Sequence, residues 1–98
     1  MSRLDDLEFE WDDAKAAANI EKHGLSFEAA TDVFRDPGLS EIDASRLVDG
    51  ETRRKALGLV DGRLIAVVYV VRGGVVRLIS ARRARIKEVR GGYRSVQT

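Results

Sequence analysis

Apolar residues in the first third of the chain recur with the three-to-four-residue spacing of amphipathic helices. Asp12 or Asp13 is suited to be a helix N-cap, because its carboxylate can accept a hydrogen bond from a free backbone N–H of the first turn. Gly24 is expected to end this helix in the left-handed conformation, which glycine adopts without a Cβ clash. Ser26 predicts the start of a second helix, which stops at Asp36-Pro37-Gly38. The apolar positions of the two helices are Ala14, Ala17, Ala18, Ile20, Phe27, Ala30, Val33 and Phe34.

Beyond residue 52 the pattern changes to that of strands. Residues 53–60, 64–71 and 75–81 are rich in apolar and β-branched side chains and predict three strands. The dipeptide Asp61-Gly62 is typical of a tight hairpin between the first two. Segment 64–71 is almost wholly apolar, so we expect it at the centre of the sheet, buried on both faces.

The remaining segments complete the predicted architecture. Residues 38–52 are polar and are interpreted as turns, with Asp49-Gly50 as a tight turn, and residues 82–90 predict a C-terminal helix. Phe9-Glu10-Trp11 is compatible with a short initial strand. We therefore predict the α+β class, with an antiparallel sheet of three to four strands, two N-terminal helices and a C-terminal helix, the helices lying on one face.

Composition narrows the class of protein. The 98 residues and 44% hydrophobic content predict a single domain over residues 1–98. There is no cysteine, which excludes a disulfide framework and a thiolate metal site, and a single histidine argues against zinc. The longest apolar run, residues 64–71, is far shorter than the roughly 20 residues of a membrane helix, and the first residues do not resemble a signal peptide. We expect a cytoplasmic protein that needs no metal or other cofactor and contacts no membrane.

Charge is divided unevenly along the chain. Residues 1–52 carry five cationic side chains against fourteen carboxylates, a net charge of −9, whereas residues 53–98 carry twelve against two, a net charge of +10. Because clustered arginine and lysine attract phosphates, the second half is expected to face a polyanionic partner. The alternative is that the two halves pair with each other across the fold.

Strand alternation assigns the cations of the strands to particular faces. Arg53 and Lys55 are expected on one face of their strand, whereas Arg77 and Ser80 are expected on opposite faces of theirs. One sheet face covered by helices and one carrying Arg and Lys would suit a phosphate backbone, which arginine binds bidentately. The alternative is a solvated face without a ligand.

The densest basic cluster lies at the junction of the third strand and the last helix. Arg82, Arg83 and Arg85 follow each other closely there, and a phosphate would also meet the free amides of the helix N-terminus. A solvated surface is again the alternative. Further candidate RNA-binding residues are Lys55, Arg72, Lys22 and Trp11.

Three other residues have both a chemical and a structural interpretation. His23, the only histidine, is a candidate general base, because histidine exchanges protons near neutral pH; a packing or helix-end role is the alternative. Trp11 is interpreted as a packing residue, with a platform for a nucleobase as the alternative. Tyr69, inside an apolar strand, is interpreted as a core residue.

Two blocks of sequence are distinctive as a pair. The first contains Phe9-Glu10-Trp11-Asp12, Lys15 through Asn19, Lys22-His23-Gly24, Ser26 through Ala30, Val33-Phe34 and Asp36-Pro37. The second is Arg77 through Ala84, and Gly50-Glu51-Thr52-Arg53 with Gly58 completes the pattern. Together they resemble the BrnT toxin family over nearly the whole chain, from Phe9 to Tyr93.

The resemblance implies a RelE-like fold and a metal-independent ribonuclease that halts translation. It also implies neutralisation by a BrnA-like antitoxin, a ribbon-helix-helix protein, in a heterotetramer that contains a toxin dimer and binds operator DNA through the antitoxin. By similarity, Arg53, Arg77 and Arg82 stand where the family keeps its functional arginines, with Glu51 and Tyr93 as further candidates. This sequence departs from the family at Tyr69, where a histidine is frequent.

The resulting hypothesis is RNA cleavage by attack of the ribose 2′-hydroxyl on the neighbouring phosphate, which leaves a 2′,3′-cyclic phosphate. The three arginines would stabilise the charge that develops on the phosphorane, and His23, Glu51 or a tyrosine would act as the base. The alternatives are a non-catalytic module that binds nucleic acid or an acidic antitoxin segment, and a structural partner in a repressor complex.

Overall fold

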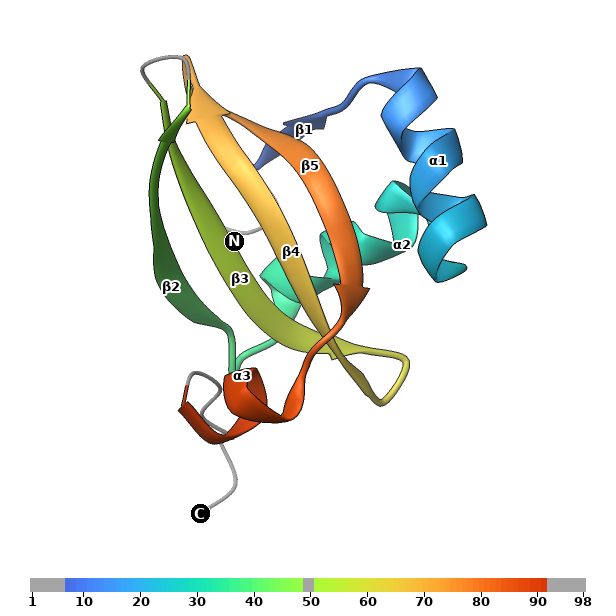
Figure 1. Ribbon diagram of the computed structural model, residues 1–98, viewed down its shortest axis with the longest axis vertical. Helices are drawn as coiled ribbons and strands as arrows, with labels where there is room; N and C mark the ends of the chain where they lie inside the picture. Colours follow the sequence, from blue (N-terminus) through green and yellow to red (C-terminus); the bar gives the residue numbers. More distant parts are fainter. Residues whose placement is uncertain (1–6, 49–50, 92–98) are drawn as a thin grey trace.

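The structure, a computed structural model, describes residues 7–48 and 51–91, with the backbone alone for residues 42–48, 51 and 52. One sheet carries helices at one face and at one end (Figure 1). In chain order the elements are β1 (Glu8–Glu10), α1 (Asp13–His23), α2 (Phe27–Ala30), the 3-10 helix η2 (Thr31–Arg35), β2 (Ser40–Val48), β3 (Glu51–Val60), β4 (Arg63–Arg72), β5 (Val75–Arg83) and α3 (Ile86–Gly91). The predicted α+β class, with two N-terminal helices and a C-terminal helix, is confirmed, but the sheet has five strands instead of three to four, and α3 lies at its end and not on the face that carries the other helices.

The sheet has five strands in the order β1-β5-β4-β3-β2. β1 runs parallel to β5, and the other neighbours are antiparallel. α1 and α2 contact β5 and η2 contacts β3, all from one side of the sheet, while α3 lies at the end where β5 stops (Figure 1). We call the sheet face opposite α1, α2 and η2 the outer face.

Local signals account for both ends of the first helix and for the start of the second. The Asp12 carboxylate accepts a hydrogen bond of 2.9 Å from the backbone N–H of Lys15, and Gly24 ends α1 with φ of 67°. The Ser26 hydroxyl accepts one of 3.0 Å from the N–H of Ala29. These capping predictions are confirmed.

Two element predictions are wrong. Residues 40–48, interpreted as turns, form β2, because their backbone pairs with β3 at the edge of the sheet despite their polar side chains. The C-terminal helix does not begin at residue 82, because β5 continues to Arg83 and the N–H of Ala84 still bonds to the carbonyl of Leu64 on β4. Asp49-Gly50 lies outside the described residues.

The hydrophobic core lies between the helices and the inner face of the sheet. Phe34 is at its centre, with its ring centroid 5.4 Å from that of Phe9 and 5.2 Å from that of Tyr69. Backbone contact is closest where η2 crosses β3: a Cβ built on Gly58 would lie 2.7 Å from the carbonyl oxygen of Val33. Only glycine allows this approach. The buried core residues are Phe27, Ala30, Val33, Phe34, Ala56, Val60, Ile65, Val67, Tyr69, Val76, Leu78 and Ala81.

A β-bulge in β5 determines which side chains reach the outer face. Tyr69 pairs with Leu78 but Val68 pairs with Ser80, so β5 has one residue more than β4 at this point. Leu78 and Ala81 are both buried in the core, although an odd separation in a regular strand would put them on opposite faces. Side chains beyond the bulge are therefore shifted by one position. The prediction that Ser80 faces away from Arg77 is wrong for this reason.

A side chain extends the pairing of β5 beyond the reach of β1. β1 pairs with β5 only at Val75–Arg77 among the described residues. Further along, the buried amide of Asn19 on α1 donates to the carbonyl of Ala81 at 2.9 Å and accepts from its N–H at 3.1 Å. The same amide also donates to the carbonyl of Leu25. Asn19 thus binds α1 to β5 with the two hydrogen bonds that a neighbouring strand would make.

Candidate functional site

The outer face brings together four of the predicted cations. Arg53 and Lys55 reach it by alternation along β3, since Ala56 and Val60 point into the core. Arg77 and Arg82 reach it because the bulge shifts the end of β5; with regular alternation, residues five apart would face opposite sides. The predicted arginines Arg53, Arg77 and Arg82 therefore share one sheet face.

Their positions across the sheet follow from the strand register. Val70 on β4 pairs with Arg77, and the β3–β4 register places Arg53 beside Val70 from the other side. With neighbouring strands about 4.8 Å apart, the backbones of the two arginines are about 10 Å apart. Arg82 pairs with Ala66, further along the same face.

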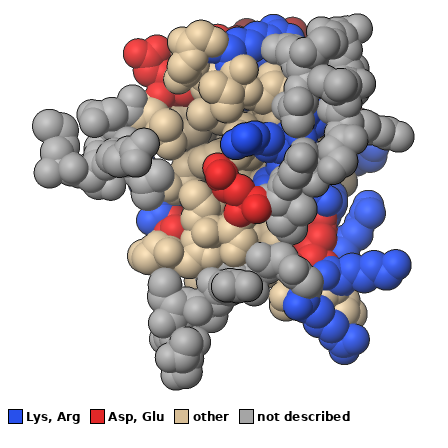
Figure 2. Space-filling view, turned by 90° about the vertical axis from the view of Figure 1, so that its left-hand side faces the viewer, with Lys and Arg blue, Asp and Glu red and all other residues tan. Residues whose placement is uncertain are grey.

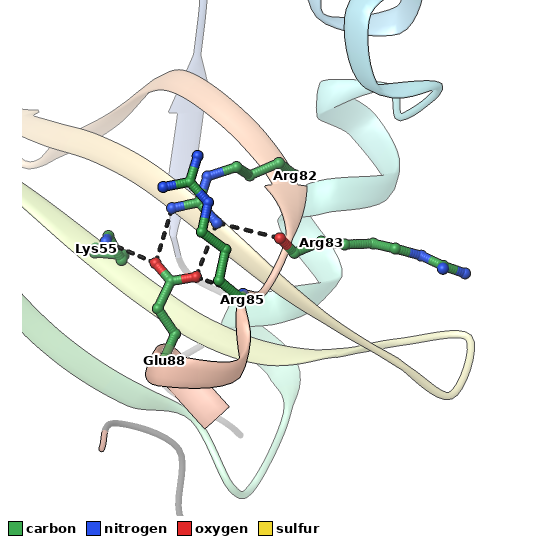
Figure 3. Close-up of polar contacts among 5 residues, drawn as sticks. All are labelled: Lys55, Arg82, Arg83, Arg85 and Glu88. Atoms are coloured by element: carbon green, nitrogen blue, oxygen red, sulfur yellow. Dashed lines mark hydrogen bonds and ion pairs between the residues drawn. The ribbon is translucent and has the colours of Figure 1, made fainter. Parts of the chain in front are cut away.

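Glu88 on α3 binds two of these cations at once. Its carboxylate accepts two hydrogen bonds of 2.8 Å from the guanidinium of Arg82 and one of 2.7 Å from the ammonium of Lys55. A fourth, of 2.7 Å, comes from the backbone N–H of Arg85 (Figure 3). The side chains of Glu88 and Arg82 are 10% and 17% exposed, so water competes little for these bonds. We call Lys55, Arg82 and Glu88 the clamp.

Protonation within the clamp follows from these contacts. The hydrogen bonds from Arg82 hold the pKa of the Glu88 carboxyl well below its usual range, with smaller contributions from the Arg85 N–H and Lys55, and these outweigh burial, which raises it. The same bond raises the pKa of Arg82. Glu88 is thus a fixed anion that orients Arg82, and a weak base.

Part of the Arg82 guanidinium remains available to a ligand. Its Nη1 donates to Glu88 and to the carbonyl of Arg83, and one N–H of Nη2 donates to Glu88. A guanidinium has five N–H groups, so the Nε–H and the second Nη2–H are without a partner among the described residues. These two donors can bind a phosphate side by side.

Some cations of the basic second half form ion pairs with carboxylates of the acidic first half, as the alternative interpretation of the charge distribution predicts. Arg77 binds Glu10 at 2.6 Å, across β1 and β5, and Arg54 lies 4.0 Å from Glu41. No ion pair of Arg53 occurs within the part of the chain that the structure describes. Figure 2, which views the side of the molecule where β2 lies, shows acidic side chains beside basic ones, and several basic side chains grouped at the lower right. On the outer face, Lys55 and Arg82 share the counter-charge of Glu88, and Arg77 has that of Glu10.

Other predicted residues lie elsewhere. His23, at the end of α1, lines a pocket on the helix side of the sheet. Arg83 lines the same pocket, because its side chain points the opposite way from that of Arg82 (Figure 3). Trp11 packs edge-on against Phe27 with ring centroids 5.9 Å apart, as expected of a packing residue. Lys22, Arg72 and Arg85 have exposed side chains on α1, at the end of β4 and before α3. Glu51 lies in β3, where only its backbone is described, and Tyr93 lies outside the described residues.

Tyr69 is a core residue, as its sequence context predicts. The residue is 2% exposed, and its hydroxyl donates to the Glu41 carboxylate at 2.7 Å. Burial and the neighbouring Glu41 raise the pKa of the hydroxyl well above its ordinary value. Tyr69 therefore holds its proton near neutral pH.

Glu88 is the functional candidate that sequence reasoning missed. It is one of only two carboxylates among the 46 residues from Arg53 onward, which carry twelve cations. That isolation was the available signal, because an acid among so many bases has an ion pair within easy reach. The predicted anion site at the helix N-terminus is also occupied from within the chain, since Glu88 accepts the N–H of Arg85.

The clamp predicts a specific pH dependence of stability. Because the pKa of Glu88 is depressed from its usual value near 4.5, its charge stabilises the folded state above that pH, and this contribution is lost as the pH falls below it. Replacing Glu88 by Gln should lower the free energy of unfolding at pH 7 by about 2 kcal/mol. This value lies between the losses typical of breaking an exposed ion pair and of breaking a buried one. Urea unfolding followed by Trp11 fluorescence from pH 7 to pH 3 measures both effects.

The control is Glu21→Gln, which removes an exposed carboxylate on α1. The Glu88→Gln variant should lose less stability than wild type between pH 5 and pH 3, whereas the control should follow wild type. Parallel pH profiles for all three proteins would contradict the clamp.

The described residues contain no helix long and apolar enough to span a membrane and no group of three or more His, Cys, Asp or Glu placed to hold a metal ion.

Comparison with known proteins agrees with the two distinctive sequence blocks. A family model described as the ribonuclease toxin BrnT of type II toxin–antitoxin systems matches residues 11–88. No curated protein matches the chain. The family match begins at Trp11 and ends at Glu88, so it includes every member of the clamp.

Proposed function

Because the chain belongs to the BrnT family of ribonuclease toxins of type II toxin–antitoxin systems, we propose that it cleaves RNA on the outer face, without a metal ion, and so inhibits translation. The observation that carries this proposal is the clamp. Glu88 fixes the Arg82 guanidinium and leaves two parallel donors to meet a phosphate. Preorganised donors of this kind stabilise developing charge without reorganising during the reaction.

The proposed reaction is an internal transfer of the phosphodiester. The ribose 2′-oxygen attacks the neighbouring phosphorus and loses its proton to a base, while the bond to the 5′-oxygen breaks and that oxygen takes up a proton. The products are a 2′,3′-cyclic phosphate and a 5′-hydroxyl. Arg82, Arg53 and Arg77 are proposed to stabilise the dianionic phosphorane, with Lys55 beside it.

Proton transfer requires groups other than Glu88, which is a weak base in the clamp. We assign it to Glu51 and Tyr93, which are candidates by family resemblance. His23 is less suited to this role, because it shares its pocket with Arg83, on the side of the sheet away from the Arg82 side chain.

The partner expected of such a toxin is an antitoxin. We propose a BrnA-like ribbon-helix-helix protein that neutralises the toxin in a heterotetramer containing a toxin dimer, with operator DNA bound through the antitoxin. Co-expression with the gene next to this one would test the pairing, because a cognate antitoxin should restore growth and co-purify with the toxin.

The test of the reaction is cleavage of a defined RNA by the purified protein in the presence of EDTA. We expect cleavage to continue in EDTA and the 3′ ends to carry a 2′,3′-cyclic phosphate, identified by mass spectrometry of the fragments. Loss of cleavage in EDTA, restored by a divalent ion, would overturn metal independence. RNA that is bound but stays intact would instead favour a non-catalytic binding module.

A further inference from the structure

A second feature on the helix side of the sheet has the character of a ligand site. It is a pocket of about 360 Å³ between the end of α1 and the hairpin that joins β3 to β4. Cavities of this size are typical of small-ligand sites. The residues that matter for its chemistry are His23, Leu25, Val60, Arg63, Ile65 and Arg83.

The pocket combines an apolar floor with a cationic rim. Leu25 and Ala29, which are partly exposed, line the floor together with the buried Val60 and Ile65 and offer apolar contact to a flat ring. Arg63 and Arg83 on the rim are exposed, and the described residues provide neither of them with an ion pair. The ligand that fits is an apolar ring carrying an anionic group, which is the chemistry of a nucleotide.

The pocket is connected to the clamp through consecutive residues of β5. Arg82 projects to the outer face and binds Glu88, while Arg83 leaves the strand in the opposite direction and lines the pocket (Figure 3). An RNA strand that crosses the end of β5 would therefore meet a guanidinium on each side of the sheet.

We propose that this pocket binds one nucleotide of the RNA substrate, more than one nucleotide away from the cleaved bond, because the pocket lies on the opposite side of the sheet from the Arg82 side chain. The base lies against Leu25 and the accessible edges of Val60 and Ile65, and its phosphate binds Arg63 and Arg83. Asp61, the one acid of the pocket, accepts a hydrogen bond from an amino group on the base, so adenine, cytosine and guanine bind better than uracil, which has none. This inference rests on the proposed ribonuclease function and adds a specificity site to it.

The experiment uses the four nucleoside monophosphates as probes of the whole chain, labelled with ¹⁵N and observed by NMR. AMP, CMP and GMP should shift the amide signals of Gly24, Arg63 and Arg83, and UMP should bind several-fold more weakly. Arg63→Ala should weaken binding by about tenfold or more, since it removes a charge-assisted hydrogen bond. Arg35→Ala removes the same charge from an exposed position on η2 and should leave binding unchanged.

Cleavage kinetics separate this proposal from the one on which it rests. Because Arg63 contributes only to binding, Arg63→Ala should raise the KM for RNA by about tenfold with little change in kcat. The Arg82→Ala variant should still bind the nucleotides, because Arg82 lies outside the pocket. Signals that move only around Lys55 and Arg82, or an Arg63→Ala variant whose KM equals that of Arg35→Ala, would overturn the subsite while leaving the ribonuclease in place. A wild-type protein that cleaves no RNA would remove both.

Discussion

Replacing Arg82 by alanine is expected to reduce RNA cleavage by about 10²–10³-fold, the cost of removing one preorganised donor to a developing oxyanion. Two N–H donors of its guanidinium have no partner among the described residues, and two further hydrogen bonds to the Glu88 carboxylate fix its orientation. The fold should persist, because Glu88 keeps its bonds to Lys55 and to the N–H of Arg85. Single-turnover cleavage and growth of bacteria expressing the variant measure the effect, and circular dichroism checks the fold.

Two further variants separate geometry from charge. Arg82→Lys keeps the charge but cannot donate two parallel hydrogen bonds, so it should remain strongly impaired. Arg35→Ala loses the same charge from an exposed side chain that pairs with Asp32 and forms no ion pair with any of the three described residues of the clamp, so this variant should cleave as wild type does. A folded Arg82→Ala protein with full cleavage and full toxicity would exclude Arg82 from the site.

Gly58→Ala is expected to destabilise the fold by about 3 kcal/mol, near the upper end for overpacking. Its new methyl group would lie 2.7 Å from the carbonyl oxygen of Val33 and 3.0 Å from its Cγ1. Because the nearest atom is backbone, relief requires η2 to move away from β3, which would open the core around Phe34. The measurement is the free energy of unfolding in urea.

Gly62→Ala provides the comparison. Gly62 has φ of 77°, which costs an alanine about 1 kcal/mol, but a Cβ there meets nothing within 4 Å. The Gly58 variant should therefore lose clearly more stability than the Gly62 variant. Equal losses would show that contact with Val33 does not constrain the position.

The sequence predicts those parts of this fold that depend on local chemistry. Asp12, Gly24 and Ser26 act on backbone groups within four residues, so the helix ends that they form can be predicted from the sequence. β2 was missed because its stability comes from pairing with β3, and an edge strand can carry polar side chains.

For the site, too, local features were predicted correctly and features that depend on long-range contacts were not. Alternation along β3 correctly predicts the shared face of Arg53 and Lys55, because that strand pairs regularly with β4. It fails on β5, where the bulge puts both Leu78 and Ala81 into the core and cannot be read from alternation alone. The role of Glu88 was hidden for a related reason, since its partner Lys55 is 33 residues away and meets it only in the folded chain.

The hydrogen bonds of Asn19 have a consequence for self-association. A strand edge with free N–H and C=O groups is a template on which a second chain can add a strand and begin to aggregate. Beyond Arg77, β5 would offer such an edge, but the Asn19 amide occupies both backbone groups of Ala81 in the middle of it. The protein thus closes this edge with one side chain instead of a further strand. An incoming chain would have to displace a buried amide before it could pair, which protects the strand that carries Arg82 from polymerisation.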